Sequence, residues 1–118
     1  MNQIQWKKLL LKEQLHQSRL TGVDVMILVY DITSKDSFNN LQDFLDQAKE
    51  HVRENTVFVV AGNKEENQDV RVVAFEEGQS FANENGASFI EVSAKTGNNV
   101  NALFYDAGVR ALKKSQED

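Results

Sequence analysis

The sequence has 118 residues, a formal net charge of −5 and 26% charged residues, which is typical of a soluble globular domain. The negative balance argues against nucleic acid as a partner, and the lack of cysteine excludes disulfides, thiolate metal sites and prenyl or palmitoyl lipid anchors. We therefore expect one cytoplasmic domain over residues 1–118.

Residues 1–21 predict a helix whose apolar side chains lie on two sides of its axis. The two groups are Ile4, Leu11 and Leu15, and Trp6, Leu9 and Leu10. One interpretation is a helix packed on the sheet. The other is a partner-binding or membrane-surface helix that uses its three lysines.

From residue 25 onward, short apolar runs alternate with helical patterns. The runs are Val25–Tyr30, Val57–Ala61 and Ser88–Val92, and we expect each of them to be a strand. The first two are continuously apolar, as strands buried on both faces are. The alternation predicts an α/β fold in which three parallel strands form a sheet with helices on both faces, a three-layer sandwich.

Three helices are expected between and after these strands. The first has apolar residues at steps of three and four from Phe38 to Val52, with Asp36 or Ser37 as its N-cap. The last has an apolar stripe from Val100 to Leu112, after Asn98 or Asn99 as the cap, and residues 113–118 are expected to be a polar tail.

The middle helix is expected to begin near Phe75 and to end at Gly86, a natural left-handed C-terminal residue. Ala74 stands where a capping serine or threonine would help, a loss of about 1 kcal/mol. The glutamates at positions 76 and 77 are expected to be surface charges rather than an acid–base pair.

Polar residues follow two of the predicted strands at the point where each ends. Gly62-Asn63-Lys64 follows the second strand, and Ser93-Ala94-Lys95 follows the third. Ligands of parallel sheets bind beyond the carboxyl ends of the strands. The two loops are therefore expected to converge on one site.

Three blocks in this order and spacing carry a resemblance to a known family. They are "DVMILVYDITSKDSFNNLQDFL", "GNK", and "RVV" followed by "EEGQSFANENGASFIEVSAKTGNNVNALF". Over residues 22–112 they resemble the C-terminal half of Rab-type small GTPases of the Ras superfamily. The resemblance implies a partial P-loop-NTPase-like sandwich after a divergent N-terminal helix.

The resemblance also implies a guanine-base site. In it, Asn63 would bond the base edge and tie the two loops together, and Lys64 would lay its methylenes over the ring. The Ala94 backbone N–H would donate to the base carbonyl. Ser93 and Lys95 would shape and flank that loop.

One departure from the family's pattern lies within this base site. Glu66 stands where the family has an aspartate that accepts two hydrogen bonds from guanine. The extra methylene moves the carboxylate by about 1.5 Å on an unchanged backbone. Glu66 is therefore expected to be a weakened specificity residue.

A second departure concerns the phosphates. None of the six glycines is followed by lysine, so the motif G-x-x-x-x-G-K-[ST] does not occur in this sequence. The family's Asp-x-x-Gly motif, magnesium threonine and catalytic glutamine have no counterpart either. We expect weak or lost binding of GTP or GDP, no magnesium site and no hydrolysis of GTP.

Three functional hypotheses remain open. The first is a truncated or degenerate Rab-like GTPase with vesicle-trafficking ancestry. The second is a non-enzymatic interaction module or homodimer that uses the N-terminal helix and the exposed edge of the strand Val25–Tyr30. The third is a partial gene product without an independent role.

Overall fold

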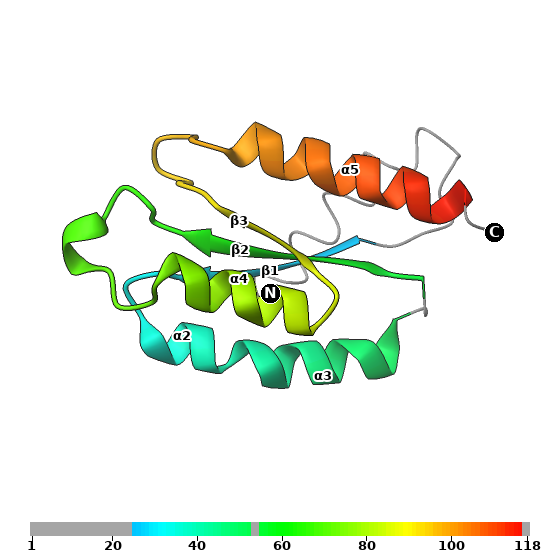
Figure 1. The fold of residues 1–118 in the computed structure, drawn as a ribbon, viewed down its shortest axis with the longest axis horizontal. Coiled ribbons are helices and arrows are strands. Elements are labelled where there is room, and N and C mark those ends of the chain that lie inside the picture. The colour runs from blue at the N-terminus through cyan, green and yellow to red at the C-terminus, as the bar shows by residue number, and fades with distance from the viewer. Residues whose placement is uncertain (1–24, 53–54, 117–118) are drawn as a thin grey trace.

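The computed structural model describes residues 25–52 and 55–116, and the helix expected over residues 1–21 lies outside these ranges. In the described ranges one sheet contains three parallel strands in the order β1-β2-β3 (Figure 1). The strands are β1 (Val25–Asp31), β2 (Val57–Asn63) and β3 (Ser88–Glu91). All three expected strands are confirmed to within two residues at each end.

Helices cover both faces of the sheet, as expected (Figure 1). One face carries α5 (Val100–Gln116). The other carries α2 (Lys35–Asn39), α3 (Leu41–His51) and α4 (Phe75–Glu84), and a short 3₁₀ helix, η1 (Gln68–Val70), precedes α4. None of the described helices has the length and apolar character that crossing a bilayer requires.

The apolar runs of β1 and β2 are continuous because alternate residues enter two different cores. Ile27 and Val59 face α5 and pack with Leu103 and Ala107. Their neighbours along the strands enter the second core, where Leu28 and Val60 pack with side chains of α3 and α4. Burial on both faces removes the period of two that a half-exposed strand shows.

Two glycines make room for the ring of Tyr30 between the sheet and α4. A Cβ built on Gly62 would lie 2.8 Å from the Tyr30 hydroxyl oxygen, and one built on Gly78 would overlap the same oxygen and the ring of Phe89. Burial, followed by the charge of Glu91, raises the pKa of Tyr30. The hydroxyl has no hydrogen-bond partner within the described ranges.

The first helix starts earlier than predicted. Its N-cap is Ser34, whose side chain accepts a hydrogen bond from Ser37 N at 3.3 Å, so the expectation of Asp36 or Ser37 as the cap was wrong. The Ser37 hydroxyl is already engaged with the backbone of Asp31 and Ser34. Asn40 divides α2 from α3 but keeps a right-handed helical backbone, with φ −77° and ψ −12°.

The C-terminal end of α4 agrees with the sequence, whereas α5 runs further than expected. The chain leaves α4 through Gly86, whose φ of +69° confirms the left-handed conformation. Ala74 is the N-cap and makes no side-chain bond, while its N–H donates to Glu77 Oε1 at 3.0 Å. Helix α5 continues to Gln116, so the expected tail at residues 113–118 is helical over its first part.

Candidate guanine-base site

The two polar loops lie side by side at the carboxyl edge of the sheet. Hydrogen bonds continue past the strands, from Val92 N to the Gly62 carbonyl at 2.8 Å and from Glu65 N to the Val92 carbonyl at 3.0 Å. The loop after β2 and the loop after β3 are therefore fixed to one another.

A side chain of one loop bonds the backbone of the other. Asn63 Oδ1 accepts a hydrogen bond from Ala94 N at 3.0 Å. The resemblance assigns this N–H to the base carbonyl, whereas in the structure it donates to Asn63. A bound base carbonyl would have to share this N–H with Asn63.

Ser93 shapes the second loop from within. Its side chain is fully buried, and its Oγ accepts a hydrogen bond from Thr96 N at 3.0 Å. Its backbone N–H donates to the Asn98 carbonyl at 3.1 Å, which closes the loop into a tight turn. Lys95 lies exposed on the outside of this turn.

Lys64 reaches toward the neighbouring strand. Its Nζ lies 2.9 Å from Asp31 Oδ2, and its backbone has a φ of +71°, which is uncommon for a residue with a side chain. Strain of this kind clusters at ligand sites. The ion pair with Asp31 raises the pKa of Lys64 and holds the lysine stem along the edge of the site.

Asp31 is a site residue that the sequence reasoning missed. Its Oδ1 accepts hydrogen bonds from Thr33 N at 2.8 Å and Thr33 Oγ1 at 2.6 Å. Partial burial raises the pKa of Asp31, but the hydrogen bonds from Thr33 and Lys64 outweigh it, so the net pKa is lowered. A signal was present in the sequence, because Asp31 directly follows the apolar run Val25–Tyr30.

Glu66 provides an ionised acceptor next to the loops. Hydrogen bonds from the Ser93 side chain and from its own backbone N–H, with the nearby charges of Lys95 and Lys64, lower the pKa of Glu66. Its Oε1 is shielded from solvent and has no hydrogen-bond partner in the described part of the chain. A shielded carboxylate oxygen without a donor fits a ligand that presents N–H groups.

Two further contacts at this edge of the sheet were not predicted. Asn98 Nδ2 donates to Glu65 Oε1 at 2.8 Å and links the two loops, while Asn99 Nδ2 donates to the carbonyl of Glu91, the last residue of β3, at 2.9 Å. Single asparagines in a polar loop carry no pattern that distinguishes such contacts from solvated turns. The sequence therefore offered no signal for them.

Within residues 25–52 and 55–116 no group of three or more His, Cys, Asp or Glu side chains is placed to hold a metal ion.

One comparison with known proteins identifies the family. The family model described as "Ras family" matches residues 12–113, beginning ahead of the stretch 22–112 on which the resemblance rests. This match covers most of the 118 residues. The chain belongs to the Ras family of small GTPases.

Proposed function

We propose that this Ras-family chain is a Rab-type member that recognises the guanine base of GTP or GDP weakly and does not hydrolyse GTP by itself. The blocks "LVYDIT" and "SAKTGNNV" support the Rab assignment. A cytoplasmic role with vesicle-trafficking ancestry follows from that assignment and belongs to the same proposal.

The observation that carries the proposal is the shielded Oε1 of Glu66 beside two loops fastened by Asn63 and Ala94. Guanine presents a ring N–H and an exocyclic amine on one edge, and an ionised carboxylate accepts from both. Adenine presents a lone pair at the corresponding ring nitrogen, which a carboxylate repels. The site therefore favours guanine.

The expected affinity is low. A few base contacts of about 1 kcal/mol each give at best millimolar binding once the entropy of association is subtracted. Phosphoryl transfer depends on positioning and neutralising the phosphates. The Gly-Lys pair that would hold them does not occur in the 118 residues, which is why the proposal stops at recognition of the base.

An NMR titration of the ¹⁵N-labelled chain with guanosine tests the proposal without any contribution from phosphate. Guanosine at millimolar concentration is expected to shift the amides of Asn63, Lys64 and Ala94, and adenosine is expected to shift them less. Glu66→Gln should weaken the guanosine response, while Glu50→Gln, on the exposed side of α3, should leave it unchanged. Equal responses to both nucleosides, or none, would reject guanine recognition.

The alternative is an interaction module, and the position of β1 favours it. In the strand order β1-β2-β3, β1 has only β2 as a neighbour among the described strands. An unpaired strand edge is a template for another chain. The test compares the sedimentation of the native chain with that of a semisynthetic chain in which Ile27 N is methylated. A dimer that dissociates on this N-methylation would support a homodimer or partner contact through the edge of β1. A monomer whose β1 amides are fully protected would argue against such a contact.

A further inference from the structure

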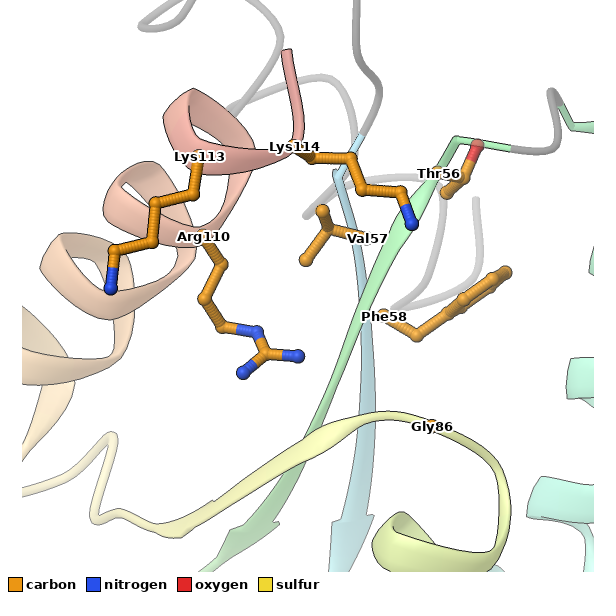
Figure 2. A pocket seen from close by; sticks show the side chains of 7 residues that line it. All are labelled: Thr56, Val57, Phe58, Gly86, Arg110, Lys113 and Lys114. Atoms are coloured by element: carbon orange, nitrogen blue, oxygen red, sulfur yellow. The ribbon is translucent and has the colours of Figure 1, made fainter. Parts of the chain in front are cut away.

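A cavity of about 260 Å³, drawn in Figure 2, lies at the start of β2. This is the end of the sheet opposite to the loops after β2 and β3, the guanine loops. The start of β2, the turn after α4 and the last turns of α5 line it, with Thr56, Val57, Phe58, Gly86, Arg110, Lys113 and Lys114. The seven residues of β2 separate this cavity from the guanine loops by about 20 Å. The two sites can therefore be tested independently.

The charged residues in the described part of the cavity lining are all basic. Arg110, Lys113 and Lys114 come from one side, and no carboxylate is among the described residues that line the cavity. Figure 2 shows the Arg110 guanidinium and the Lys114 ammonium extending from α5 toward the space over the start of β2. This concentration of positive charge is unusual in a chain whose net charge is −5.

Three other basic side chains of the described ranges are paired with carboxylates: Lys35 with Glu77, Lys64 with Asp31, and Arg71 with Glu91. Within residues 25–52 and 55–116 neither Arg110 nor Lys113 forms such an ion pair. The charges of Arg110 and Lys113 are therefore available to an anion from solution.

The dipole of α5 explains only part of this arrangement. Lysines in the last turn of a helix interact favourably with its C-terminal carbonyls, which accounts for Lys113 and Lys114. Arg110 lies one turn earlier and projects into the hollow (Figure 2). An interaction with the helix dipole also does not require a cavity, so the dipole does not explain why these side chains line one.

The floor of the cavity contains a further hydrogen-bonding group. Thr56 is 7% exposed, and its hydroxyl has no hydrogen-bond partner among the described residues. Figure 2 shows the hydroxyl turned away from Arg110. Rotation about χ1 of Thr56 exchanges the positions of the hydroxyl and the methyl group. The hydroxyl can then donate a hydrogen bond to a ligand in the cavity.

We propose that this cavity binds a phosphate group, carried by a phosphorylated small molecule or by a lipid headgroup. The planar fork of arginine matches phosphate oxygens in pairs, and lysine adds a compact positive charge. The volume is below that of most drug-sized ligand pockets and suits one or two phosphates.

A titration of the ¹⁵N-labelled full chain with inorganic pyrophosphate, at constant ionic strength, tests the proposal. Saturable shifts are expected at Thr56, Gly86 and Arg110, with none at Asn63 or Ala94. Arg110→Gln and Lys113→Gln, both at exposed positions, should each weaken binding about tenfold or more. The matched control Lys49→Gln removes an exposed charge from α3 and should leave the affinity unchanged.

Vesicles separate the two sources of phosphate. The chain is sedimented with vesicles of phosphatidylcholine alone and with phosphatidylcholine vesicles that contain phosphatidylinositol phosphate. Co-sedimentation with the second kind only, abolished by Arg110→Gln, would assign the ligand to a lipid. Saturable binding of pyrophosphate without vesicle binding would assign it to a soluble phosphate.

Two outcomes would overturn the proposal. One is the absence of saturable binding in both experiments. The other is a set of shifts spread over the chain that Arg110→Gln and Lys49→Gln reduce equally, since that pattern is general charge screening. Guanosine lacks phosphate and pyrophosphate lacks a base, so failure at this cavity is distinguishable from failure at the guanine loops.

Discussion

Arg71 and Glu91 face each other in a two-bond ion pair, with 2.8 Å from Nη1 to Oε2 and 2.6 Å from Nη2 to Oε1. Arg71 also donates to the Val73 carbonyl at 2.8 Å and to Gln68 Oε1 at 3.0 Å. Arg71 lies after the loop that follows β2, and Glu91 ends β3 just before the loop that begins at Ser93. The pair therefore joins the two segments that carry these loops.

Breaking this pair should destabilise the fold. The two side chains are only 19% and 12% exposed, so removing one leaves the other charge poorly solvated. Arg71→Ala is expected to lower the free energy of unfolding by about 3 kcal/mol, measured by urea denaturation. The control is Lys35→Ala, which breaks the exposed pair with Glu77 and should have a much smaller effect because solvent screens that pair. Equal losses in both variants would contradict this account of Arg71.

Asp31 should contribute to the loss of stability in acid. Its pKa in the folded chain is below the ordinary value of 3.8, so its stabilising contribution is complete above that value and disappears as the pH falls through the folded pKa. Asp31→Asn is expected to lower the melting temperature at pH 7 and to reduce its dependence on pH below about pH 4. The control Asp46→Asn, on α3, should keep the wild-type pH profile.

Gly78 and Gly86 should respond to alanine for different reasons. At Gly78 a Cβ overlaps the Tyr30 hydroxyl and the Phe89 ring, and the strain is expected to cost roughly 1–3 kcal/mol, more than the gain in helix propensity. At Gly86 the added Cβ meets nothing, and the cost of roughly 1–2 kcal/mol comes from the φ of +69°. Combining Gly78→Ala with Tyr30→Phe tests the first cause, because removing the hydroxyl should recover part of the loss.

Ala74→Ser should stabilise the chain. Serine at this N-cap provides an oxygen for the first turn of α4, whereas alanine provides none, and a gain of about 1 kcal/mol is expected. Thermal unfolding of Ala74→Ser and of Ala74→Val separates capping from a change in side-chain size. A gain in the valine variant as large as that in the serine variant would contradict the capping explanation.

The strands and the two loops could be predicted because their signals are local. Continuous apolar runs identify β1 and β2, and the polar residues that follow them locate the edge where ligands bind. The left-handed Gly86 was equally local, because glycine is favoured at that backbone conformation.

The contacts between distant segments could not be predicted in the same way. Arg71 and Glu91 are 20 positions apart and meet only because β3 pairs with β2 while η1 leads into α4. The basic cavity required the ends of α5 and β2 to be brought together.

The nucleotide content of the purified 118-residue chain, measured after preparation with magnesium present, tests the central claim most directly. Recognition of the base alone predicts millimolar binding, so the chain should emerge without bound nucleotide and respond only to added guanosine or guanine nucleotide. Stoichiometric GDP that survives purification would contradict the account.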